Sequence, residues 1–167
     1  GNVIGGGDWA RDRIVTDMVA ALMAGRPVPV RNPQAIRPWQ HVLEPLSGYL
    51  TLAAAMLERP DAKWSSGWNF GPVSGTELPV GKLMDAFVKA WGDGKWVDQS
   101  LPTQPHEASI LRLSIEKAGW ELGWRPRWTC EEMVKRTTQW YRSVLCEKAD
   151  ACKACEADII AYGDGLA

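Results

Sequence analysis

Hydrophobic residues recur at helical spacing in several parts of the chain. A first stripe at i, i+3 and i+4 runs through residues 13–24 and predicts an amphipathic helix that Gly25 and Pro27 terminate. Residues 46–58 are rich in Leu and Ala and predict a second helix, with Pro45 in its first turn.

The remaining helices are predicted by a second set of stripes and by capping residues. Residues 80–91 carry a clean apolar face, and residues 150–162 predict a last helix. Between them, Ser114 is placed to cap a short helix. Thr129 and Glu132 form a capping box, in which hydroxyl and carboxylate satisfy free backbone N–H groups reciprocally, so a long helix is expected to follow.

Strand signals are short and scattered. We expect extended segments at residues 1–4, 28–31, 39–43, 68–70 and 95–98. The pattern predicts an α/β unit that is mostly helical with few short strands. A length of 167 residues fits one domain covering residues 1–167.

Composition and charge exclude several classes of protein. A net charge of −1 gives no sign of a nucleic-acid or anionic membrane surface. No apolar run approaches the ~20 residues of a membrane-spanning helix, and no signal peptide leads the chain. We therefore expect a cytoplasmic protein without nucleic-acid or membrane partners. The abrupt start without Met leads us to expect a part of a longer protein.

Cysteine and tryptophan add little chemistry. Cys152 and Cys155 have the spacing of a metal or redox pair, but no second pair accompanies them, and His41 and His106 are far away in sequence. We expect both thiols on a helix surface and no bound metal. The ten tryptophans are expected mainly in the core, although an indole can also stack on a nucleobase.

The glycine cluster Gly5-Gly6-Gly7 follows the first strand, as a phosphate loop would. A dinucleotide loop needs G-x-G-x-x-G, but Ala10 occupies the third glycine position and Asp8 would repel a pyrophosphate. The cluster is therefore expected to be a tight turn whose backbone approaches another group closely.

Four polar side chains are better candidates for ligand binding. Asn2 lies at the end of a strand, and Arg13 lies in the first turn of a helix, where backbone N–H groups favour anions. Arg31 and Arg37 flank the turn at residues 32–33. A guanidinium donates two parallel charged hydrogen bonds, which suits a diphosphate.

Five stretches together resemble the C-terminal half of the CDP-glucose 4,6-dehydratase family, which belongs to the extended short-chain dehydrogenases/reductases. They are GNVIGGGDWARDR, RPVPVRNPQAIRPWQHVLEPLSGYL, WNFGP, PHEASILRLSIEKA and LGWRPRW. The resemblance implies the mostly helical substrate-binding half of such a protein, without the N-terminal Rossmann domain.

The resemblance also implies a function. Full-length members hold NAD, oxidise C4 of the hexose, eliminate water and return the hydride, while the C-terminal half binds the nucleoside diphosphate. By position, Asn2 resembles a substrate contact, Arg37 a diphosphate ligand and His106 a residue near the phosphates. Arg31 stands where relatives place a residue facing the base, and Arg13 where some carry a cation. The expected ligand is CDP-glucose or a similar sugar nucleotide.

Two parts of the family pattern are missing. The family uses a Tyr with a Lys four residues later for proton transfer, and none of Tyr49, Tyr141 and Tyr162 is followed by that Lys. The glycine motif for NAD is also absent. We therefore expect no catalytic residue, no cofactor site and no turnover in this chain alone.

Residues 39–72 resemble a segment that returns to the Rossmann sheet in the family. Without that sheet, an apolar helix and a strand edge would be uncovered, so we expect a homo-oligomer. Two alternatives remain open: a stand-alone sugar-nucleotide binding or interaction module, and a structural remnant that binds nothing.

Overall fold

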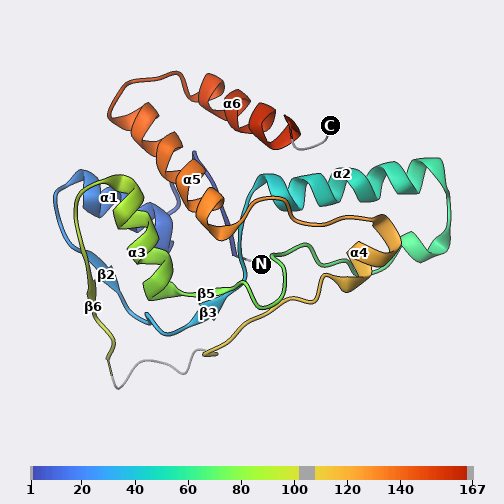
Figure 1. Cartoon of the computed structure of the whole chain (residues 1–167), viewed down its shortest axis with the longest axis horizontal. Coiled ribbons are helices and arrows are strands. Elements are labelled where there is room, and N and C mark those ends of the chain that lie inside the picture. Colours follow the sequence, from blue (N-terminus) through green and yellow to red (C-terminus); the bar gives the residue numbers. More distant parts are fainter. Residues whose placement is uncertain (1, 102–107, 165–167) are drawn as a thin grey trace.

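A computed structural model describes residues 2–101 and 108–164 (Figure 1). Helices dominate the described part, and the strands are only two or three residues long. The fold class predicted from the sequence, mostly helical α/β with few short strands, is confirmed. The helices are α1 (Ile14–Met23), α2 (Leu43–Glu58), the 3-10 turn η1 (Ala62–Trp64), α3 (Val80–Trp91), α4 (Glu116–Leu122), α5 (Cys130–Leu145) and α6 (Ala151–Gly163).

The strands of the described part form three separate pairs. Two pairs are parallel, β1 (Asn2–Ile4) with β4 (Trp39–His41) and β2 (Val28–Val30) with β6 (Trp96–Asp98). The third pair is antiparallel and joins β3 (Ile36–Arg37) to β5 (Leu78–Pro79). Parallel partners lie far apart in sequence, so these pairs connect distant segments of the chain.

The main core lies between α1, α3 and α5, which carry the predicted apolar stripes (Figure 1). Met18, Leu83 and Phe87 are fully buried there. Helix α3 begins and ends as predicted, and Gly92 closes it in the left-handed conformation at φ 96°. That conformation favours glycine, which explains the residue chosen at this stop.

A smaller cluster lies beside α2 and α4, away from the main core (Figure 1). Phe70, Ile115 and Trp124 are buried in it. Helix α2 covers this cluster with one face and leaves large apolar side chains of another face in solvent. These exposed residues are Leu46, Tyr49, Leu50, Met56 and Leu57.

The glycine turn after β1 packs against α5. A side chain at Gly6 would overlap the indole ring of Trp140, so only glycine lets the backbone approach so closely. The hydroxyl of Tyr141 donates to the carbonyl of Asp8 at 2.7 Å, which holds the turn from the other side. The predicted close approach is confirmed, and the group approached is an indole of the same chain.

Two local predictions are wrong. Residues 68–70 form no strand in the described structure: the carbonyl of Phe70 accepts a hydrogen bond from Gln40 Nε2 at 2.7 Å, a side-chain partner instead of a neighbouring strand. Ser114 does not cap α4, whose N-cap is Ile115 without a side-chain hydrogen bond. The Ser114 hydroxyl instead donates to Glu116 at 3.2 Å.

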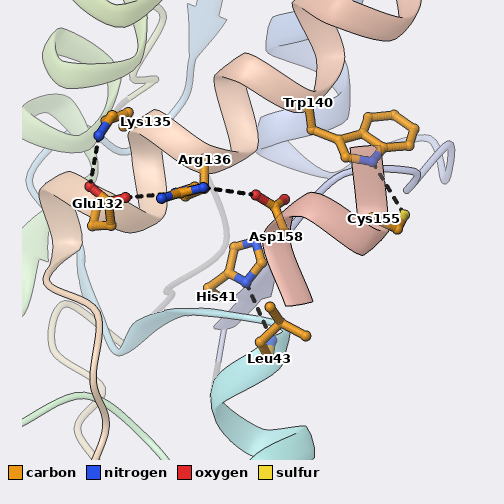
Figure 2. A network of polar contacts seen from close by, with 8 residues as sticks. All are labelled: His41, Leu43, Glu132, Lys135, Arg136, Trp140, Cys155 and Asp158. Carbon is orange, nitrogen blue, oxygen red and sulfur yellow. Dashed lines mark hydrogen bonds and ion pairs between the residues drawn. The ribbon is translucent and has the colours of Figure 1, made fainter. Parts of the chain in front are cut away.

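Only half of the capping box at α5 forms. Thr129 Oγ1 accepts from the N–H of Glu132 at 3.2 Å, as predicted. The Glu132 carboxylate instead accepts from Arg136 at 2.6 Å, and Arg136 reaches Asp158 of α6 at 3.6 Å (Figure 2). The pKa of Asp158 is raised, because the effect of burial exceeds the opposing effect of the Arg136 charge. The Arg136–Asp158 ion pair therefore joins α6 to α5.

Candidate functional site

A cleft of about 760 Å³ brings four of the five predicted site residues together. Asn2, Arg13, Arg31 and Arg37 all line it, although they come from different elements. The fifth, His106, lies outside the described residues.

The β2–β6 pair positions one wall of the cleft. Val30 and Asp98 are register partners in this parallel pair, so the residues after them lie side by side at the carboxyl ends of the strands. These residues are Arg31 and Gln99, and the Gln99 N–H donates to the Val30 carbonyl at 2.8 Å. Carboxyl ends of parallel strands are common ligand positions.

Asn2 lines the cleft from β1. It is the first residue of β1 and lies opposite Trp39, the first residue of β4. It lines the cleft because β1 starts beside Trp39.

Arg13 lies at the N-cap of α1, just before the first turn in which it was expected. Its side chain is 63% exposed, and Nη1 lies 3.6 Å from the carboxylate of Asp8. Asp12 and Asp17 also line this part of the cleft. An anion bound here would therefore meet Arg13 together with nearby carboxylates.

Arg37 is a buried cation in the wall of the cleft. It is only 7% exposed, and its Nη1 donates to the carbonyl of Ile36 at 2.9 Å. Its place in β3, paired with β5, fixes the backbone from which it projects. A buried guanidinium has already lost much of its hydration, which strengthens its interaction with an anion.

The charge balance of the cleft is weakly positive. Three arginines and two aspartates are among the residues that line it. Among its described lining residues there is no His, Lys, Tyr, Ser or Cys. This set of side chains can bind an anion through charged hydrogen bonds but offers no obvious general acid–base pair.

Five polar or aromatic lining residues were not among the predicted site residues: Asp12, Asp17, Asn32, Trp39 and Gln99. Gln99 follows a predicted strand, so the parallel pairing of that strand with residues 28–31 would have indicated it. Trp39 follows Arg37 closely in sequence, and its position beside a candidate diphosphate ligand was a usable signal.

His41 is buried outside the cleft. Its Nδ1 accepts from the N–H of Leu43 at 3.3 Å (Figure 2), and its ring lies 4.7 Å from that of Trp128. Burial and the nearby charge of Arg136 lower the pKa of His41 to about 4. The imidazole is therefore neutral near pH 7, with its proton on Nε2.

Cys155 and Cys152 both lie on α6 with exposed side chains, where the sequence placed them. Cys155 has an additional contact, because Trp140 Nε1 donates to its sulfur at 3.3 Å (Figure 2).

Within the described residues, no helix is long and apolar enough to cross a membrane.

Similar known proteins are sugar-nucleotide dehydratases and epimerases. No family model matches the chain. The chain is 45% identical to CDP-glucose 4,6-dehydratase of Salmonella typhimurium over 86% of its length. It is 32% identical to the UDP-glucose 4-epimerase GEPI42 of Cyamopsis tetragonoloba over 70% of its length. It spans only 40% and 32% of these two relatives.

Solved structures share the fold at lower identity. The NAD-dependent NDP-hexosamine 5,6-dehydratase TunA superposes with a TM-score of 0.68 at 22% identity, covering 90% of this chain and 45% of that one. UDP-glucose 4-epimerase from Bifidobacterium longum, solved with NAD+ and UDP, gives a TM-score of 0.65 at 17% identity, covering 87% and 46%. The resemblance predicted from the sequence is confirmed: the chain is related to CDP-glucose 4,6-dehydratase and, with it, to the sugar-nucleotide dehydratases and epimerases of the extended short-chain dehydrogenase/reductase family.

Proposed function

We propose that this chain is the sugar-nucleotide-binding half of a CDP-glucose 4,6-dehydratase-like protein, and that its cleft binds the nucleoside diphosphate of CDP-glucose. The observation that carries the proposal is the convergence of Asn2, Arg13, Arg31 and Arg37 on one cleft. The 45% identity to a CDP-glucose 4,6-dehydratase supports the choice of nucleotide.

In this proposal each arginine contacts a different part of the ligand. Arg37, buried and held by β3, donates to the diphosphate, and the more exposed Arg13 adds charge from the N-cap of α1. Arg31, at the end of β2, faces the base. Asp12 and Asp17 oppose an anion, so the arginines must come closer to the phosphates than these carboxylates do.

Catalysis is proposed to need a further part of the protein. The glycine turn does not fit the pyrophosphate of NAD, because the Trp140 ring fills the space beside Gly6. NAD and the proton-transfer groups would come from the Rossmann half that full-length relatives carry, and the chain alone is proposed to bind without turnover.

The apolar face of α2 is proposed to be an interface. Leu50 and Leu57 are 72% and 84% exposed on a helix that otherwise covers the second cluster. Residues 39–72 are proposed to pack against a Rossmann sheet in the whole protein. In the isolated chain, we propose that the same face pairs two copies into a homo-oligomer.

Ligand binding tests the proposed function directly. CDP-glucose would be titrated into the purified chain and followed by tryptophan fluorescence, with dTDP-glucose as the competing nucleotide. Because a half-site lacks the contacts of the other half, we expect a dissociation constant near the millimolar range, about −4 kcal/mol. Saturable binding that prefers CDP-glucose is the expected result.

Variants connect the signal to the cleft. Arg37→Ala and Arg31→Ala should each weaken binding about tenfold or more, because each loses a charge-assisted hydrogen bond. Arg26→Ala removes an exposed arginine outside the cleft and should leave binding unchanged. Equal binding of both nucleotides would favour a general sugar-nucleotide module, and no response at millimolar ligand would leave only the structural remnant.

A further inference from the structure

A second cavity of about 170 Å³ shares only Trp39 with the larger cleft among the described lining residues. Its walls come from the start of α2, the segment before β5 and the segment leading into α5. None of Asn2, Arg13, Arg31 and Arg37 lines this cavity.

Three of its lining residues each carry a buried polar atom that has no hydrogen-bond partner in the described structure. The atoms are Trp39 Nε1, Gln40 Oε1 and Glu77 Oε1. All three side chains are strongly buried: Trp39 and Gln40 are 9% and 4% exposed, and the Glu77 side chain is 1% exposed. Buried polar groups without partners are rare in native proteins, and each calls for a specific explanation.

Neighbouring contacts fix these groups in place. Gln40 Nε2 donates to the Phe70 carbonyl at 2.7 Å, so the amide cannot flip and Oε1 remains the free acceptor. The other oxygen of Glu77 accepts from the Gly75 N–H at 2.8 Å and lies 3.7 Å from Arg112. Glu44 also lines the cavity, but both its oxygens already accept from the backbone N–H of Arg127.

We propose that this cavity is a site for ordered water, which accepts from Trp39 Nε1 and donates to Gln40 Oε1 and Glu77 Oε1. One donor and two acceptors complement a water molecule, which offers two hydrogens and its lone pairs. Buried waters typically make about three such bonds, and each needs only ~30 Å³ of liquid volume, so several fit.

Other occupants match these atoms less well. An apolar ligand would leave all three atoms unpaired. A cation would meet the indole N–H of Trp39, which points positive charge at it, and Arg112 already lies beside Glu77. Because Trp39 forms part of both cavities, water behind it fixes the indole at the wall of the larger cleft, whatever that cleft binds.

A crystal structure of the chain tests the proposal. The expected result is density in the cavity within hydrogen-bond distance of Trp39 Nε1, Gln40 Oε1 and Glu77 Oε1. The proposal is overturned by a cavity without ordered density, by side chains that pair with one another, or by an anomalous peak there after soaking in rubidium.

A solution measurement keeps the test independent of crystals. Oxygen-17 relaxation dispersion counts waters that stay bound longer than the protein tumbles. Trp39→Phe should lower this count relative to the unmodified chain. Trp64→Phe is the matched control, because Trp64 Nε1 donates directly to the Arg59 carbonyl at 2.7 Å, and it should leave the count unchanged. An unchanged count in Trp39→Phe overturns the proposal, and neither result depends on nucleotide binding.

Discussion

At the scale of single residues, the glycine turn and α5 are fitted to each other at Gly6 and Trp140. A methyl group at Gly6 would overlap the indole ring, which is held by Tyr141 packed against it at 5.3 Å. Packing of the backbone against Trp140 therefore explains why position 6 is glycine, without a bound phosphate.

Gly6→Ala should lower the free energy of unfolding by about 1–3 kcal/mol or more, the usual cost of overpacking. Urea unfolding followed by circular dichroism would measure it. Gly67→Ala is the control, since nothing lies within 4 Å of an added Cβ there, and should change stability by less than about 0.5 kcal/mol. Equal stability of both variants would contradict the packing explanation.

His41 should make the protein less stable in acid. Its pKa is about 4 in the folded state, against the ordinary value of 6.5. The unfolded chain therefore binds a proton more readily, so stability falls as pH drops from about 6.5 to about 4, by up to about 3 kcal/mol. Above pH 6.5 this contribution is fully present.

Urea unfolding at several pH values would measure this dependence. His41→Gln should flatten the curve between pH 6.5 and 4 relative to the unmodified chain. An NMR titration that shows the His41 ring protonating near its ordinary pKa would contradict the expected burial effect.

At the scale of elements, α6 is anchored at its end to the start of α2. Tyr162 donates to Glu44 at 2.7 Å, and its hydroxyl lies 2.9 Å from that of Ser47. Burial and the Glu44 carboxylate raise the pKa of Tyr162, so it keeps its proton for this bond. Arg136 and Asp158 tie the middle of α6 to α5 (Figure 2).

Tyr162→Phe should destabilise the protein by about 1–3 kcal/mol, because it removes the hydroxyl donor from the buried Glu44 carboxylate, which keeps only backbone N–H donors. Tyr49→Phe is the matched control: its ring packs on Phe70 but is largely exposed, so removing its hydroxyl should change little. Thermal unfolding of the two variants compares them. Equal melting temperatures would show that the contact between α6 and α2 contributes no stability.

Sequence patterns predicted the elements with local signals and missed those that depend on distant partners. The helix at residues 80–91 was found because its apolar stripe and Gly92 are local features. The prediction of a strand at residues 68–70 is wrong because a strand needs a neighbouring strand to hydrogen-bond with. The Phe70 carbonyl accepts from the Gln40 side chain instead. The antiparallel pair β3–β5 was missed for the same reason, since two residues give no periodicity.

The candidate site shows the same division. Arginine chemistry singled out Arg31 and Arg37, and the fold brings them to one cleft. Gln99 was missed because it joins them only through the parallel pairing of β2 with β6. The unpartnered atoms around the second cavity had no sequence signal at all, because burial and hydrogen bonding are properties of the folded chain.

At the scale of the whole molecule, α2 exposes an unusually apolar face. Exposed apolar patches often mark interfaces with another chain. Leu50→Glu or Leu57→Glu should reduce the mass measured by light scattering, because a buried carboxylate would oppose association. Ile160→Glu places the same charge on α6, at a residue 62% exposed, and should leave the mass unchanged. A monomer in the unmodified chain would contradict the proposed homo-oligomer.

The most direct test of the central claim is an amide NMR titration of the chain with CDP-glucose. We predict saturable shifts concentrated at the cleft, at Arg13, Arg31, Arg37 and Gln99, with the exposed Arg26 and helix α4 unaffected. Shifts that do not saturate, or that gather around α4 instead, would contradict the assignment of this cleft to the sugar nucleotide.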